Sequence, residues 1–138
     1  MDRDVIEQKI ESLRRCVARV RLKCPATADA LANDVDAQDI LTLNLTRAVQ
    51  LCVDIGAHII AARDNPAPDT MGQTFDVLAA LGLISPELAV RMKKAVGFRN
   101  IAVHNYEAID WQIAHAIATR HMENFTAFAG AIADATGI

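Results

Sequence analysis

Apolar residues recur at alternating spacings of three and four along most of the chain, which is the period of an α-helix. The first helix is predicted to begin at Asp2 or Asp4 and to end near Lys23, ahead of Pro25. Aspartate favours the N-cap position, and the residue before a proline is disfavoured in helical backbone. The apolar stripe of this helix consists of Ile6, Ile10, Leu13, Val17, Val20 and Cys24.

The longest helix is predicted to open at Asp34 or Asp36, after an acidic connection over residues 25–35, and to end near Arg63. Its four-three stripe consists of Leu41, Leu45, Ala48, Cys52, Ile55, Ile59 and Ala62. Further apolar residues, Leu43, Val49, Leu51, Val53 and Ile60, widen this stripe beyond one face. A helix that is apolar on most sides is expected at the centre of its bundle or in a dimer interface.

Three more helices are predicted towards the C-terminus. A short one begins after Thr70, which forms a possible capping box with Gln73, and runs through residue 81. The next restarts at Ser85-Pro86, a cap followed by a proline in the first helical position, and the last runs from Trp111 to about residue 135. The fold class is therefore all-α: residues 1–138 form one domain, an up-down bundle of four to five helices.

Composition supports this architecture and limits the function. The 138 residues are 52% hydrophobic but only 4% aromatic, which favours packed helices over sheets. A net charge of −3 argues against a nonspecific nucleic-acid coat, so any RNA contact must be local. The charged N-terminus and the lack of a long uncharged run predict a soluble, cytoplasmic protein that makes no membrane contact. The three cysteines show no metal-ligand spacing and are expected to be reduced core thiols.

A local basic cluster breaks this acidic average. It lies on the first predicted helix and consists of Arg14, Arg15, Arg19, Arg21 and Lys23. Such a run can contact RNA or an acidic partner, or can simply be the solvated face of a helix. The sequence leaves these alternatives open.

The most informative stretch is Gly97 to Tyr106, Gly-Phe-Arg-Asn-Ile-Ala-Val-His-Asn-Tyr. It offers a permanent planar cation, Arg99, and a side chain that exchanges protons near neutrality, His104. These are the groups that phosphodiester chemistry needs for charge neutralisation and proton transfer. The alternative is structural, because an Arg and a His near a helix end often serve as a cap or as salt-bridge partners.

Helical geometry constrains this stretch. At about 100° per residue, Arg99 and His104 lie roughly 140° apart on one straight helix and cannot face the same phosphate. Either the helix ends or distorts within the motif, for which Gly97 offers a break, or a second copy of the chain completes the site. We favour the two-fold dimer, because it also provides a second histidine as acid to the first as base.

Asp54 and His58 interrupt the longest predicted helix at positions i and i+4, so the two side chains can pair. A buried hydrogen-bonded pair or an outward-pointing pair is the structural explanation. Asp54 is also a candidate site residue of lower rank.

The spacing Arg99, four residues, His104, one residue, Tyr106, together with Asn100, Ile101, Ala102 and Val103, resembles the signature of the HepT toxins of the HEPN superfamily. This resemblance spans nearly the whole chain, and the segment around Asp54 is similar to a HepT helix that carries a polar residue close to the motif. It implies a homodimeric ribonuclease toxin of a type II toxin–antitoxin module that needs no metal and no cofactor. The implied partner is a nucleotidyltransferase antitoxin of the MNT kind.

The resemblance also implies roles. His104 would move protons, Arg99 would neutralise charge on phosphorus, and Asn100 would orient a phosphate oxygen or the histidine. Tyr106 matches the tyrosine to which the antitoxin transfers AMP, a modification that would block the cleft with bulk and negative charge. An alternative function is a non-catalytic nucleotide- or substrate-binding subunit of a two-component nucleotidyltransferase. A plain dimerising interaction module is a third.

Overall fold

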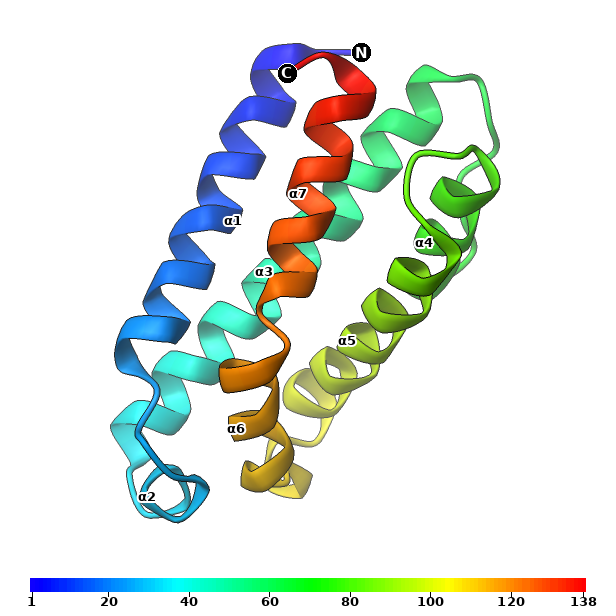
Figure 1. The fold of residues 1–138 in the computed structure, drawn as a ribbon. Coiled ribbons are helices and arrows are strands. Elements are labelled where there is room, and N and C mark those ends of the chain that lie inside the picture. The colour runs from blue at the N-terminus through cyan, green and yellow to red at the C-terminus, as the bar shows by residue number, and fades with distance from the viewer.

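A computed structural model describes all of residues 1–138 and confirms the all-α fold class. It contains no strand, but the bundle has more helices than the four to five that the sequence predicts (Figure 1). The seven α-helices and one 3₁₀ helix are α1 (Arg3–Lys23), α2 (Ala28–Ala32), α3 (Val35–Ala62), α4 (Met71–Ala80), α5 (Pro86–His104), η1 (Tyr106–Ala108), α6 (Trp111–Arg120) and α7 (Glu123–Thr136).

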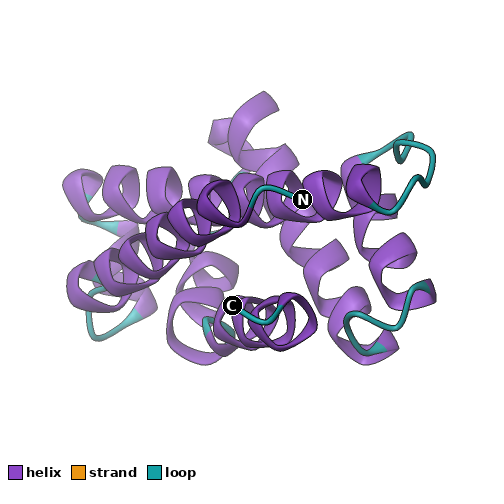
Figure 2. Ribbon diagram, turned by 90° about the horizontal axis from the view of Figure 1, so that it is seen from above, coloured by secondary structure: helices purple, strands orange, loops and turns teal.

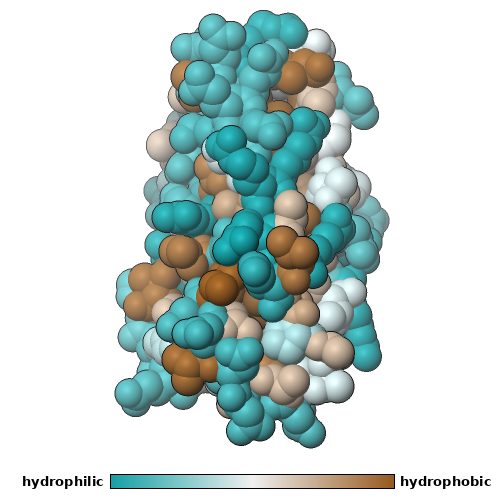
Figure 3. Space-filling model, turned by 90° about the vertical axis from the view of Figure 1, so that its left-hand side faces the viewer, coloured by the Kyte–Doolittle hydropathy of each residue, from teal (hydrophilic) through white to brown (hydrophobic).

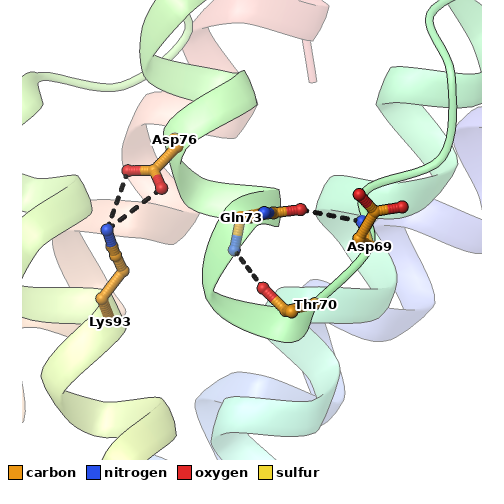
Figure 4. A network of polar contacts seen from close by, with 5 residues as sticks. All are labelled: Asp69, Thr70, Gln73, Asp76 and Lys93. Atoms are coloured by element: carbon orange, nitrogen blue, oxygen red, sulfur yellow. Dashed lines mark hydrogen bonds and ion pairs between the residues drawn. The ribbon is translucent and has the colours of Figure 1, made fainter.

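Side-chain caps fix where the long helices begin. The side chains of Asp2, Asp34 and Ser85 accept backbone N–H groups at the starts of α1, α3 and α5, as predicted. Thr70 caps α4 by accepting the N–H of Gln73 at 3.2 Å (Figure 4). The predicted capping box is shifted by one residue, because the Gln73 side chain accepts from the N–H of Asp69, at 2.9 Å, and not from that of Thr70.

Two predicted segments differ from the structure. The connection over residues 25–35 contains α2, which Thr27 caps and which buries Leu31 completely. The predicted last helix is two helices, α6 and α7, separated at His121 and Met122 although no Gly or Pro occurs there. Packing explains this break: α6 lies mainly against α2, whereas α7 lies against α5, α1 and α3, so the two helices pack on different partners.

α3 is the central helix, as its broad apolar surface predicts. It contacts α1, α2, α4, α5 and α7 and supplies the largest share of a continuous core of 34 buried residues. By length and hydropathy α3 could cross a membrane, but 50% of its most apolar window is buried within the bundle. The central helix of a helical bundle passes the same test, so this is a weak indication of a membrane span.

The two ends of the bundle differ in content. One end holds both chain termini, where the Arg3 guanidinium donates to the carbonyls of Thr136 and Gly137 at 3.3 and 3.0 Å (Figures 1 and 2). The opposite end holds α2, the start of α3 and the end of α5 (Figure 1). α4 and α5 form a helical hairpin beside α3, and an ion pair between Lys93 and Asp76 at 3.0 Å joins them (Figure 4).

Candidate functional site

The Arg-Asn-Ile-Ala-Val-His-Asn-Tyr motif covers the last turns of α5 and the start of η1. α5 continues without interruption through Gly97 to His104, and Asn105 then leaves the helix with φ −150° and ψ 66°. The helix therefore ends within the motif, as one alternative predicts, but it ends only after His104, and no break at Gly97 separates Arg99 from His104. On this continuous helix Arg99 and His104 point roughly 140° apart and lie about 7.5 Å apart along the axis.

The polar side chains of the motif have few partners within the chain. The half-buried Arg99 donates from Nη1 to Oδ1 of its neighbour Asn100 at 3.1 Å and has no carboxylate partner. His104 is exposed and makes no hydrogen bond or ion pair. The role of salt-bridge partner, which the sequence left open for both residues, is therefore not realised in the protomer.

Tyr106 is held in place by two contacts. Its hydroxyl donates to Oδ1 of Asp39 in α3 at 2.9 Å, and its ring meets Trp111 edge to face at a centroid distance of 5.9 Å. Burial raises the pKa of Tyr106, and the hydrogen bond to the Asp39 carboxylate raises it further. The phenol is thus protonated at neutral pH and is still 38% exposed.

Asp39 is not among the site residues that the sequence predicts. It precedes Tyr106 by 67 residues and carries no motif of its own. The one available signal is its place in the first turns of the longest helix, on the face that also carries Leu43 and Arg47 at spacings of four.

Asp54 lies apart from the motif. Its carboxylate accepts a hydrogen bond from Gln50 at 2.9 Å and lies 3.9 Å from the Lys9 ammonium, in a groove between α1 and α3. The expected pair with His58 does not form, because Nε2 of His58 accepts the backbone N–H of Asp2 at 3.1 Å. The polar α3 residue next to the motif is therefore Asp39.

Other lysine and histidine side chains of the chain have structural partners or lie at the surface. Lys93, near the motif in sequence, is bound to Asp76. Nε2 of His115 donates to the Pro25 carbonyl at 2.9 Å, and His121 ends α6 at the surface. No group of three or more His, Cys, Asp or Glu side chains lies close enough together to hold a metal ion.

The family model described as "Ribonuclease HepT-like" matches residues 6–132. A Shewanella oneidensis protein named mRNA nuclease HepT is 34% identical over 125 residues, covering 91% of this chain and 93% of the relative. The chain belongs to the HepT-like ribonuclease family. The resemblance that rested on the motif is thereby confirmed at the level of the family, and with it ribonuclease activity.

Two further HepT relatives extend the comparison. A tRNA nuclease HepT of Aphanizomenon flos-aquae is 26% identical, covering 77% of this chain and 72% of its own length. The solved structure of a tri-AMPylated Shewanella oneidensis HEPN toxin in complex with its MNT antitoxin superposes with a TM-score of 0.89. That toxin is 33% identical, with coverage of 97% of this chain and 99% of the other.

Proposed function

We propose that this HepT-like protein is the toxin of a type II toxin–antitoxin module and that it cuts RNA in a cleft shared by two copies of the chain. In this proposal residues 1–138 act as one domain, and Arg99 of one copy works with His104 of the other. The observation that carries the proposal is the continuity of α5. One copy cannot turn both side chains to the same phosphate, whereas two copies related by a two-fold axis can.

The surface around the motif supports association between copies. Ile101 and Val103 alternate with the polar motif residues and are 45% and 51% exposed. Apolar side chains that surround a polar site gain free energy when a second protein surface covers them.

The proposed chemistry uses only these side chains and needs no metal or cofactor. His104 takes the proton of the ribose 2′-hydroxyl, whose oxygen attacks phosphorus while the bond from phosphorus to the 5′-oxygen breaks. The histidine of the second copy protonates the leaving 5′-oxygen. The products are a 2′,3′-cyclic phosphate and a 5′-hydroxyl. Arg99 neutralises the charge that develops on the phosphoryl oxygens, and Asn100, its hydrogen-bond partner, orients the guanidinium or an oxygen.

Asp54 is given no part in this chemistry. Gln50 and Lys9 engage its carboxylate, and it belongs to the groove between α1 and α3.

Control by an MNT-type antitoxin completes the proposal. Tyr106 receives AMP on its hydroxyl, and Asp39 holds that hydroxyl at 2.9 Å in a fixed orientation. The added phosphate places negative charge two residues from His104, where it repels the RNA backbone. Tyr106→Phe should therefore stay toxic in cells that contain the antitoxin, and mass spectrometry should find no AMP on it.

Mixing wild-type with His104→Ala chains tests the shared site. If each cut needs the histidines of both copies, a mixed dimer is inactive, whereas independent copies would each keep their own activity. After random mixing in equal amounts we expect about a quarter of the cleavage given by the same total amount of wild-type protein, because about a quarter of the dimers contain two wild-type chains. About half of that cleavage, in dimers shown to be mixed, would contradict the shared arrangement. Wild-type protein that binds nucleotide but leaves tRNA and mRNA intact would support the non-catalytic alternative.

A further inference from the structure

A second concave surface lies between α1 and α3, in the half of the bundle that also holds the motif. This α1–α3 groove has a volume of about 640 Å³ and is open to solvent. Arg15 and Arg19 of α1 and Arg47 of α3 line it, whereas its one acidic residue is Asp54. Figure 3 shows the side of the bundle on which α1 lies, where strongly hydrophilic groups surround apolar ones across the middle of the face.

The three guanidinium groups carry charge that the protomer does not balance. Arg19 and Arg47 have no carboxylate partner, and Arg15 donates only to the hydroxyl of Ser12 at 3.2 Å. Five basic residues and no acidic one lie between residues 12 and 24, in a chain whose net charge is −3.

The arginines of the two helices act on the same place. Burial raises the pKa of the Cys16 thiol, while the positive charges of Arg47 and Arg15 oppose that rise. Cys16 lies in the wall of the α1–α3 groove together with Arg15 of α1 and Arg47 of α3. At the other end, Gln50 and Lys9 already compensate Asp54. The groove therefore offers positive potential to an anion from outside the chain.

The α1–α3 groove is continuous with the proposed active site along α3. Asp39, which accepts the Tyr106 hydroxyl, is followed at spacings of four by Leu43 and Arg47, both in the groove wall. Arg47 thus lies about 12 Å from Asp39 along the helix axis. An RNA strand that is cut at His104 must leave the motif over neighbouring surface. This surface carries several arginine side chains, whose planar guanidinium groups match phosphate oxygens.

We propose that the α1–α3 groove binds the phosphate backbone of substrate RNA beside the cut site, through Arg15, Arg19 and Arg47. This inference rests on the proposed ribonuclease function and extends the RNA-binding surface beyond the cut site. We call the part of this surface in the α1–α3 groove the RNA track. Of the alternatives for the basic cluster, it assigns RNA contact to two members, Arg15 and Arg19. Arg15 and Arg19 point into the track, whereas Arg14 pairs with Glu11 at 3.7 Å on the outer face of α1.

The test compares a long single-stranded RNA with a dinucleotide in the full-length protein. The variant Arg15→Gln/Arg19→Gln/Arg47→Gln is matched by Arg63→Gln/Arg91→Gln/Arg120→Gln, which removes the same charge from exposed arginines outside the groove. We expect the ratio of the cleavage rate of long RNA to that of the dinucleotide to fall by about tenfold or more in the groove variant. When the logarithm of its RNA-binding constant is plotted against the logarithm of salt concentration, the slope should become less steep by about two. The matched variant should keep both.

Binding of long RNA to the His104→Ala protein, which should not cut it, separates this inference from the proposed function. If wild type cuts RNA but the groove variant keeps its preference for long RNA, the track is wrong and the ribonuclease stands. An equal loss of the preference for long RNA in both charge variants would show that only the total charge of the protein matters, and not the groove. Loss of antitoxin binding with unchanged RNA kinetics would show that the groove docks a protein. If wild type leaves RNA intact and His104→Ala does not bind it, the proposed function itself fails.

Discussion

The two halves of α5 differ in the contacts that their polar side chains make within the chain. In the first half Ser85 caps the helix, and Lys93 bonds to Asp76 of α4 at 3.0 Å. In the last turns Arg99 reaches only its neighbour Asn100, and His104 reaches nothing within the chain. The fold therefore engages Ser85 and Lys93, whereas Arg99 and His104 have no carboxylate partner within the chain. The other charged residues of the first half, Glu87, Arg91 and Lys94, are exposed. The first half should therefore contribute stability, and the last turns activity.

The sharpest way to break this comparison is His104→Ala. We expect RNA cleavage to fall by about 10²–10⁴-fold, the range that proton-transfer groups contribute. The free energy of unfolding should change by no more than about 0.5 kcal/mol, because the side chain is exposed and unpartnered. An RNA digestion assay and thermal unfolding measure the two effects.

His121→Ala is the matched control, because His121 also ends a helix at the surface. It should leave both cleavage and stability unchanged. Equal loss of cleavage in the two variants, or unfolding of His104→Ala at a much lower temperature, would remove the distinction between the two halves of α5.

The opposite effect is expected where α4 packs on α3. A Cβ atom at Gly56 would lie 2.6 Å from Cγ2 of Thr74 and 3.0 Å from Cδ1 of Leu78. Gly56→Ala should therefore lower the free energy of unfolding by about 1–3 kcal/mol through overpacking, while folded protein keeps its RNA cleavage. Chemical denaturation followed by circular dichroism gives the stability, and digestion at low temperature gives the activity.

Gly97→Ala provides the contrast within α5. A Cβ atom there meets nothing within 4 Å, and the position lies inside a regular helix. We expect stabilisation by about 0.8–1.0 kcal/mol from helix propensity alone. Destabilisation of the monomer fold by this substitution would show that α5 is less regular at Gly97 than the structure has it.

Local signals made much of this molecule predictable from its sequence. Asp34 and Ser85-Pro86 mark helix starts because their side chains or rings suit the first turn, and the apolar width of residues 35–62 predicts a central helix. The motif residues can be predicted as site candidates because they lie close together in the sequence, between Arg99 and Tyr106, and their chemistry is distinctive.

Long-range packing decided what the sequence did not reveal. The break between α6 and α7 has no Gly or Pro and follows from the different helices on which each half lies. Asp39 joins the site only because the end of α5 meets the start of α3, a contact between residues 67 positions apart. Asp54, chosen for its place on the same helix, lies four turns further along and contacts α1 instead.

Asp39→Asn refines the comparison at the edge of the motif. Tyr106 is the one tyrosine in the chain, so the alkaline ultraviolet titration of phenolate reports this residue. The folded state raises the pKa of Tyr106, so the stability gained from its protonated form is complete below about pH 10 and is lost as pH rises through the folded pKa. We expect Asp39→Asn to lower the pKa of Tyr106 and to weaken this alkaline loss of stability.

Asp36→Asn removes the same charge from the first turn of α3 without touching Tyr106, and it should leave the titration unchanged. A pKa of Tyr106 that is equal in wild type and Asp39→Asn would show that burial alone sets it. The hydroxyl would then be free to turn, and its fixed orientation for AMP transfer would lose support.

The smallest effect is expected from the ion pair between Lys93, in the first half of α5, and Asp76 of α4. The side chains of Lys93 and Asp76 are 47% and 52% exposed, so water screens their attraction. A double-mutant cycle with Lys93→Ala and Asp76→Ala should give a coupling free energy below about 1 kcal/mol, and neither variant should change RNA cleavage. Weaker cleavage in Lys93→Ala but not in Asp76→Ala would mean that the lysine leaves its partner for a phosphate when RNA is bound. In that case the boundary between the two halves of α5 would lie two turns closer to Ser85.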